Sequence, residues 1–293
     1  MSMALTAAMV LSMAATPVFA EDTASDEGFN LNLCIASEPQ TIDPALNSAV
    51  DGAIMCNHMF EGLAKWVNDG EGNAVTAPGQ AESWEKTENE DGTVTYTVKL
   101  RDGIKWSDGQ DVTAGDFVYA WQRIFKKKGS YYYMFADGIA SIQGAQELSD
   151  KIDVGEELTD DDLNSMGVKA LDGYTLEVKT TVRVSFLDEL LAFPPLYPIN
   201  EKFAEKQGSK YGKSAKTILG NGAFKMINLE PGSVAEFKKN ENYYDQKHVK
   251  LQRLVMKLVQ EPKVAAQAFE AGETDYAPIN SDLVDKYKED DSL

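Results

Sequence analysis

One stretch of the sequence, residues 93–121, constrains the fold most, because it holds a strand pattern, a turn and a helix start in that order. Alternate residues over 94–100 are apolar, which places one side of a β-strand in a core and the other in water. Residues 107–109 (Ser-Asp-Gly) are of the types that form tight turns. Thr113 and Asp116 then fit a capping box at the start of a helix whose apolar residues recur at helical spacing. The stretch predicts a strand that leads through a turn into an amphipathic helix.

The composition predicts a chain with a substantial core and an acidic surface. Its 293 residues are 43% hydrophobic and 10% aromatic, and the length suits one large domain or two ordinary ones. The formal net charge of −19 argues against double-stranded nucleic acid as a partner, because phosphate binding needs clustered Lys and Arg. The acidic residues are dispersed along the chain, and this pattern predicts a solvated surface.

The N-terminus predicts export from the cytoplasm. Residues 1–20 carry no charge, and the small residues Val18 and Ala20 suit signal-peptide cleavage before Glu21. The Lys or Arg that normally opens such a signal is absent, which a start codon assigned too far downstream would explain. A retained membrane anchor is the alternative, but several polar residues make the segment only modestly hydrophobic and favour cleavage. Residues 21–27 are expected to form a disordered lead.

The two cysteines, Cys34 and Cys56, are expected to be buried and unpaired. Cys34 lies in the apolar run 31–35, and Cys56 lies among apolar residues at helical spacing. Free cysteine in such surroundings behaves as a small hydrophobic residue. An exported protein could also join the two in a disulfide, so that alternative stays open.

Apolar runs and turn residues predict the remaining elements. Strands are expected at 31–35, 168–171, 174–178, 251–258 and 275–278, and helices at about 51–60, 200–207 and 262–271, with short helices after Thr159 and Asn280. Asp172-Gly173 signals a two-residue hairpin turn. The glycine-rich run 220–222 lacks the spacing of a phosphate loop.

Catalytic and metal chemistry find little support in the sequence. The chain has two histidines, His58 and His248, and it has no HExxH or CxxC spacing for zinc and no GxSxG nucleophile elbow. Carboxylate pairs could serve glycoside hydrolysis, but nothing singles out one pair among 47 acidic residues. We therefore predict no enzyme, no catalytic residue, no metal site and no cofactor.

Two ordered motifs resemble a known family. The string KLRDGIKWSDGQDVTAGDFVYAW (99–121), together with TIDPA (41–45) and FEGL (60–63), is similar to the signature of extracytoplasmic solute-binding proteins of peptide ABC importers, the oligopeptide-binding type of family 5 above all. The resemblance runs from Leu31 to Leu293 and covers the first half of the family pattern. It implies an α/β fold of the periplasmic-binding-protein-like type II class, with one lobe, an inserted strand-rich subdomain and the second lobe missing. It also implies that the glycines of the run 220–222 permit turning and close backbone approach.

The resemblance also implies a domain organisation. Residues 28–60 and 196–293 are expected to form a discontinuous and incomplete core lobe, and residues 61–195 the inserted subdomain. The proline-rich run 193–198 would mark the crossing between them. Because full members continue into a second lobe, the sequence is expected to be a fragment or the product of a truncated gene.

The same resemblance nominates ligand-binding residues: Ser48, Val50, Tyr132 and Asn280. Ser48 replaces an acidic residue of the best-known members, which puts an ion-pair role there in doubt, and Pro278 stands where some members have Tyr. Three consecutive tyrosines, 131–133, leave the register open by one, and a packed surface loop is the alternative for them. A helix cap is the alternative for Asn280.

The implied function is capture of oligopeptides outside the cytoplasmic membrane and delivery to an ABC transporter permease, by a protein that is expected to be monomeric. Binding would use main-chain hydrogen bonds, as in strand addition, and closure of two lobes. The same fold could bind a dipeptide, a metal chelate, haem or a sugar instead, since fold does not fix the ligand. A secreted hydrolase is the alternative from another class.

Overall fold

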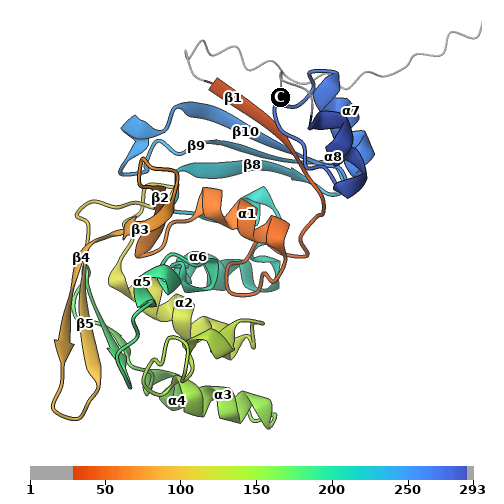
Figure 1. Cartoon of the computed structure of the whole chain (residues 1–293). Coiled ribbons are helices and arrows are strands. Elements are labelled where there is room, and N and C mark those ends of the chain that lie inside the picture. Colours follow the sequence, from red (N-terminus) through yellow and green to blue (C-terminus); the bar gives the residue numbers. More distant parts are fainter. Residues whose placement is uncertain (1–28, 289–293) are drawn as a thin grey trace, which may run out of the picture.

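The computed structural model describes residues 29–288, which fold into two four-stranded sheets, a separate two-stranded hairpin and the helices around them (Figure 1). The first sheet lies at the top of Figure 1 and the second at the lower left. The signal peptide expected at residues 1–20 and the disordered lead expected at residues 21–27 lie outside the described residues. Strands and helices are mixed along the chain, as an α/β fold requires.

The first sheet joins the start of the described chain to its last third. Its strand order is β1 (Phe29–Ile35), β10 (Leu251–Leu258), β9 (Val234–Lys239) and β8 (Phe224–Glu230). β1 is parallel to β10, whereas β10, β9 and β8 are antiparallel neighbours. The strand predicted at 251–258 is confirmed with the same limits, and the strand predicted at 31–35 begins two residues earlier.

The second sheet is built from the middle of the chain. Its order is β4 (Ala81–Glu88), β5 (Val94–Leu100), β7 (Thr175–Thr180) and β6 (Val168–Ala170), all antiparallel. The alternation predicted over 94–100 is confirmed, since Val94, Tyr96, Val98 and Leu100 are buried. β2 (Ala64–Asn68) and β3 (Ala74–Pro78) form a hairpin of their own.

The helices cover these sheets and connect them. They are α1 (Val50–Met59), α2 (Ala114–Lys126), α3 (Ala145–Asp153), α4 (Asp160–Asn164), α5 (Leu187–Leu190), α6 (Glu201–Gln207), α7 (Pro262–Glu270) and α8 (Ser281–Tyr287), with short 3₁₀ turns η1 (Tyr132–Phe135), η2 (Pro194–Leu196), η3 (Gly208–Lys210), η4 (Ala215–Thr217) and η5 (Gln246–His248). Helix α1 packs against β8 beneath the first sheet (Figure 1). The helices predicted near 51–60, 200–207 and 262–271 are confirmed within two residues at each end.

The capping box predicted at α2 is present, and α4 has one as well. At α2, the side chain of Asp116 accepts hydrogen bonds from the backbone N–H of Thr113 (2.8 Å) and from its hydroxyl (3.0 Å). At α4, the side chain of Asp162 accepts the backbone N–H of Thr159 (2.9 Å), and the Thr159 hydroxyl accepts the backbone N–H of Asp162 (3.1 Å). These side chains satisfy N–H groups that a helix start leaves without partners, so the sequence alone specifies where each helix begins.

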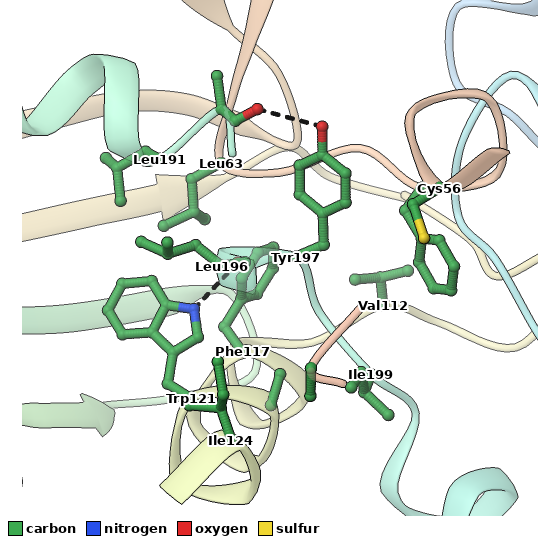
Figure 2. Close-up of a cluster of buried hydrophobic side chains, with 14 of the residues drawn as sticks. Cys56, Leu63, Val112, Phe117, Trp121, Ile124, Leu191, Leu196, Tyr197 and Ile199 are labelled. Carbon is green, nitrogen blue, oxygen red and sulfur yellow. Dashed lines mark hydrogen bonds between the residues drawn. The ribbon is translucent and has the colours of Figure 1, made fainter. Parts of the chain in front are cut away.

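The core is centred on α2 (Figure 2). The apolar face of this helix, which includes Phe117, Trp121 and Ile124, packs against Leu63 and against the segment 191–199. Trp121 is fully buried, and its indole Nε1 donates a hydrogen bond of 3.0 Å to the carbonyl of Leu196. Burying one such large side chain contributes roughly 1.5–3 kcal/mol. The packing and the hydrogen bond together hold the proline-rich run against the helix.

Both cysteines are free and buried, as predicted. Cys34 is in β1, and Cys56 is in α1 beside the carbonyl of Ile42, 3.4 Å from its sulfur. Burial raises the pKa of the Cys56 thiol, with a smaller contribution from the charge of Asp43. The thiol therefore stays protonated and unreactive at neutral pH.

Two local predictions are wrong. Residues 275–278 do not form a strand: only Tyr276 pairs, in an isolated parallel bridge to Leu33. Pro278 follows two residues later and has no N–H to extend the ladder. The turn at Asp172 is also longer than the predicted two residues, because the N–H of Leu171 reaches the carbonyl of Thr175. The Asp172 carboxylate accepts the N–H of Tyr174 at 2.7 Å and so stabilises this wider turn.

The glycines at 220 and 222 permit close backbone approach, as predicted. The N–H of Gly222 donates a hydrogen bond of 2.7 Å to the carbonyl of Met59, at the end of α1. A Cβ at Gly220 would lie 2.1 Å from that carbonyl oxygen, and a Cβ at Gly222 would lie 2.7 Å from backbone atoms of Met59 and Phe60. Backbone atoms cannot give way as a flexible side chain can, so only glycine fits here.

A Gly220→Ala variant is expected to be destabilised by about 1–3 kcal/mol, since the added methyl overlaps the Met59 carbonyl. Urea unfolding followed by circular dichroism measures the change. Gly173→Ala is the matched control, because no atom lies within 4 Å of its added Cβ. Equal stability of the two variants would contradict the close approach.

The stability of the fold is expected to fall at mildly acidic pH because of His58. This side chain is partly buried on α1, with its ring centroid 6.1 Å from that of Phe224 on β8. Burial lowers the pKa of His58 from its ordinary 6.5. The unfolded chain then binds the proton more readily, so the stabilising contribution is present above pH 6.5 and is lost as the pH falls below it.

The free energy of unfolding, measured at about pH 7.5 and at about pH 5.5, tests this pH dependence. In the His58→Gln variant, the difference between the two values is expected to be smaller than in wild type. The control is His248→Gln, because the His248 side chain is 83% exposed. That variant is expected to retain the loss that His58 causes. A His58→Gln variant with the full wild-type loss would show that other groups are responsible.

Candidate functional site

Ser48 and Val50 lie together where the loop after β1 enters helix α1. Both are exposed, and Val50, the first residue of the helix, is 78% exposed although it is apolar. The Asn47 side chain holds the backbone around them: its Nδ2 donates to the carbonyl of Ala49 (3.0 Å), and its Oδ1 accepts the N–H of Ala49 (3.3 Å). The loop is thus ordered internally while its two candidate residues face outward.

The start of α1 is tied to the end of β1 by Asp51. Its carboxylate accepts hydrogen bonds from the N–H of Ser37 and from the Ser37 hydroxyl, the latter at 2.7 Å. Asp51 is buried and lies in the first turn, where the N-terminal end of the helix dipole favours a negative charge. The candidate loop is therefore fixed at both of its ends.

The middle of the same loop is held by a buried ion pair between Asp43 and Arg123 of α2. The two guanidinium nitrogens donate to the two carboxylate oxygens at 2.9 and 2.8 Å, and the side chains are 1% and 5% exposed. Burial by itself lowers the pKa of Arg123, but the charge and hydrogen bonds of Asp43 outweigh it, so the pKa is raised. The geometry is the bidentate form that gives such pairs their strength and direction.

Tyr211 and Gly212 complete the surroundings of this pair. The Tyr211 ring lies over the Arg123 guanidinium, 5.1 Å from ring centroid to Cζ. Gly212 has a φ of +73°, and a Cβ there would meet Asp43 atoms within 3 Å. Its carbonyl accepts the N–H of Ile42 at 2.9 Å. The arginine is thus held between an aromatic face and a carboxylate, with backbone filling the remaining space.

Tyr132 begins the 3₁₀ turn η1, which is the first element after α2. Its hydroxyl donates to the carboxylate of Asp153, and its ring packs 6.0 Å from the Phe125 ring. The hydrogen bond to Asp153 raises the pKa of Tyr132. Tyr131 packs edge-on against Phe193, so of the three tyrosines Tyr133 is the most exposed, at 49%. Tyr131 and Tyr132 are therefore partly packed, as the surface-loop alternative expects, whereas Tyr133 is mainly exposed to solvent.

Asn280 is exposed at the N-cap position of α8, but its side chain makes no capping hydrogen bond. The segment before it lies along β1: the N–H of Cys34 donates to the carbonyl of Tyr276 at 3.0 Å, and the bridge between the two segments is parallel. The chain beyond Tyr276 therefore runs in the direction of β1, towards the end at which the candidate loop begins (Figure 1).

The structure places two of the four predicted residues, Ser48 and Val50, together. Ser48 and Val50 share one loop, and the segment that leads to Tyr132 touches that loop, since a Cβ at Gly129 would lie 2.0 Å from the carbonyl oxygen of Ala45. Asn280 is related to them only through β1, and no side-chain hydrogen bond connects it to the other three within residues 29–288.

Sequence reasoning did not assign roles to the residues that support the site. Asp43 lies inside the quoted motif TIDPA, and Arg123 lies two residues beyond the end of the motif 99–121. The signal for the pair was an arginine beside the buried residues Trp121 and Ile124 of a helix, which requires a carboxylate partner. A second unassigned cluster surrounds Glu61, which accepts hydrogen bonds from Tyr243 and from Gln80 (3.1 Å).

Lys65 extends the Glu61 cluster towards the surface. Its Nζ lies 3.5 Å from the Glu61 carboxylate and donates to the Tyr244 hydroxyl at 3.0 Å. Burial lowers the pKa of Lys65, but the neighbouring Glu61 and Tyr244 outweigh this effect and raise it. The cluster ties the FEGL segment to the turn after β9, and its groups are occupied with one another, so we assign it a structural role.

The hollows at the surface of the described residues include two of similar volume. One of about 260 Å³ lies between α7, the segment before Asn280 and α8, and is mostly apolar; it is lined by Ala266, Phe269, Asp275, Tyr276, Ala277, Ile279 and Tyr287. The other, of about 240 Å³, lies between the starts of α2 and α6 and is polar. Residues 29–288 contain no group of three or more His, Cys, Asp and Glu side chains that could hold a metal ion.

Comparison with known proteins gives the class. Residues 76–293 match the model of the bacterial extracellular solute-binding proteins, family 5 (middle region), and the chain belongs to this family. The chain is 33% identical over 248 residues to the oligopeptide-binding protein OppA of Bacillus subtilis. The matched region covers 84% of this chain and 42% of that protein.

Solved structures agree. The substrate-binding domain of an oligopeptide ABC transporter from Bacillus anthracis superposes with a TM-score of 0.76 at 34% identity, over 89% of this chain and 47% of that one. OppA of Listeria monocytogenes bound to peptide gives 0.78 at 28% identity, over 91% and 49%. The α/β fold of this family is thereby confirmed, and the chain spans about half the length of the relatives it matches. None of the helices in the described part is long and apolar enough to cross a membrane.

Replacement of Asp43 by Asn is expected to destabilise the protein by about 3–5 kcal/mol, because Arg123 is left buried with an uncompensated charge. Thermal and urea unfolding measure the loss. Asp188→Asn is the matched control: that carboxylate is partly exposed and pairs with Lys86 at 3.3 Å, so about 1 kcal/mol or less is expected. Similar losses of stability in the two variants would show that the buried ion pair contributes no more than an exposed one.

Proposed function

We propose that this protein captures peptides outside the cytoplasmic membrane and presents them to the permease of an ABC transporter. Membership of the extracellular solute-binding family carries the proposal. Two relatives point to the ligand by name: one is an oligopeptide-binding protein and the other was solved with a bound peptide. The proposed location outside the cytoplasm follows the same family and the uncharged N-terminal segment.

The exposed candidate residues form the proposed contact surface. Ser48, Val50 and Asn280 are exposed, and the backbone around the first two is held by the Asn47 side chain. The segment that leads to Tyr132 touches the same loop at Ala45. Fixed backbone of this kind suits a ligand recognised through its main chain, because the protein pays little entropy to order itself on binding. The hydroxyl of Tyr132 already bonds Asp153, so we propose that the ring, and the neighbouring Tyr133, make the contact at that point.

We further propose the division into a core lobe of residues 28–60 and 196–293 and an inserted subdomain of residues 61–195. The composition of the sheets supports it, since the first sheet contains only segments from the two outer parts, and the second only segments from the inner part. Binding and release would occur by movement of whole lobes, with no covalent step and no bound cofactor. Delivery to the permease would require that the loaded form be recognised at the membrane.

Native mass spectrometry of the protein purified from the extracytoplasmic fraction of its host tests this function. A ladder of co-purifying peptides that disappears on denaturation is the expected result. Protein that carries no peptide, and that takes up none from an added pool of tri- to pentapeptides, would overturn the proposal. Retention of a dipeptide, a metal chelate, haem or a sugar instead would keep the fold class and change the ligand, and turnover of any substrate in a hydrolase screen would favour the enzyme alternative.

A further inference from the structure

One buried ion pair joins the loop that bears Ser48 and Val50 to the end of α2, from which the chain continues to the tyrosine segment 131–133. We propose that the Asp43–Arg123 pair fixes the loop that bears Ser48 and Val50 against the tyrosine segment 131–133, and so determines how tightly a peptide main chain is held. Asp43 and Arg123 are positioning residues in this inference, since both are buried and neither can touch a ligand. The consequence for affinity rests on the proposed peptide-binding function.

On the loop side, Asp43 organises the backbone that leads to Ser48. One carboxylate oxygen accepts the N–H of Ala45 at 3.0 Å as well as the bond from Arg123. The backbone carbonyl of Asp43 accepts the N–H groups of Leu46 (3.0 Å) and Asn47 (2.8 Å). A displacement of the Asp43 side chain would therefore move the turn immediately before Ser48.

On the helix side, Arg123 lies in the turn from which the tyrosine segment departs. The carbonyl of Arg123 accepts the N–H of Lys127 at 2.9 Å, and the carbonyl of Ile124 accepts the N–H of Gly129 at 2.9 Å. Between them Lys128 has a φ of +52°, a left-handed conformation that non-glycine residues seldom adopt. The chain is thus turned sharply at the end of α2, and the guanidinium is part of that rigid end.

The two segments also touch directly. A Cβ on Gly129 would lie 2.0 Å from the carbonyl oxygen of Ala45 and 2.9 Å from a side-chain carbon of Ile124. The backbone at Gly129 does not have a positive φ, so an alanine there would be opposed by this contact and not by its own conformation. The ion pair pulls the segments together, and the absent side chain at Gly129 lets them meet.

The pair is suited to positioning because its geometry has few alternatives. The two oxygens and two nitrogens of a bidentate contact define both distance and orientation. Tyr211 and Gly212 occupy the space into which either side chain could turn. Binding sites generally need their contact groups held within about 0.5 Å, so a small change at the pair would reach the proposed ligand surface.

Two variants test the inference in the full-length protein of the natural gene. Arg123→Lys keeps the charge but removes the bidentate geometry, and Gly129→Ala keeps the ion pair but forces the segments apart. Gly115→Ala is the matched control, since Gly115 is exposed on the same helix and its added Cβ would make only an ordinary contact, 3.5 Å from the Thr113 hydroxyl oxygen.

Hydrogen exchange read by mass spectrometry is the readout that needs no ligand. Both test variants are expected to exchange faster in residues 41–50 and 129–135 together, with β5 and β7 of the second sheet unchanged and the control like wild type. A merely stabilising role would instead raise exchange throughout the fold. Either unchanged exchange in both segments, or acceleration spread evenly over the protein, would overturn the positioning role.

Peptide binding is measured in parallel with a pool of tri- to pentapeptides under conditions where all variants are folded. Affinity is expected to fall about ten-fold or more for both test variants and to stay unchanged for the control. Unchanged affinity in the two test variants, when wild type binds, would overturn the link between the pair and the ligand. Absence of binding by wild type would count against the proposed function alone, and the exchange result would still decide whether the pair positions the two segments.

Discussion

The burial of helix α2 is the constraint on which the rest of the structure depends. Its apolar face supplies the centre of the core, where Trp121 bonds the carbonyl of Leu196 and so connects the proline-rich run to the helix. Its buried arginine, Arg123, reaches in another direction to Asp43. A single helix thus carries both the hydrophobic packing and the polar contact that orders the loop before α1.

This double role follows from the geometry of a helix. Residues at helical spacing share a face, so Phe117, Trp121 and Ile124 can be buried while Arg123, next to Ile124 in sequence, points elsewhere. Burial of a guanidinium is unfavourable unless a carboxylate neutralises it and accepts its hydrogen bonds. The pairing with Asp43 therefore fixes the loop between β1 and α1 against helix α2.

In the candidate site, one set of side chains orders the backbone and another set is exposed to solvent. Asp43, Asn47 and Asp51 direct their side chains towards the backbone of the loop or towards β1 and α2. Ser48 and Val50, which lie between them, are exposed. Ordered backbone with outward side chains suits recognition of a ligand through its main chain. The family to which the chain belongs consists of solute-binding proteins, which agrees with such a role.

Local patterns in the sequence determined much of this protein. The strand at 94–100, both capping boxes and the limits of β10 follow from alternation and short-range hydrogen bonds, which involve residues close together in the chain. Ordered motifs were enough to indicate the family. What only the tertiary structure decided involves distant residues: the parallel pairing of β1 with β10, the bond of Asp43 to Arg123, and the contact of Gly129 with Ala45. The physical reason is that such contacts depend on which surfaces meet once the chain is folded, and no pattern within a short window of sequence specifies its partner.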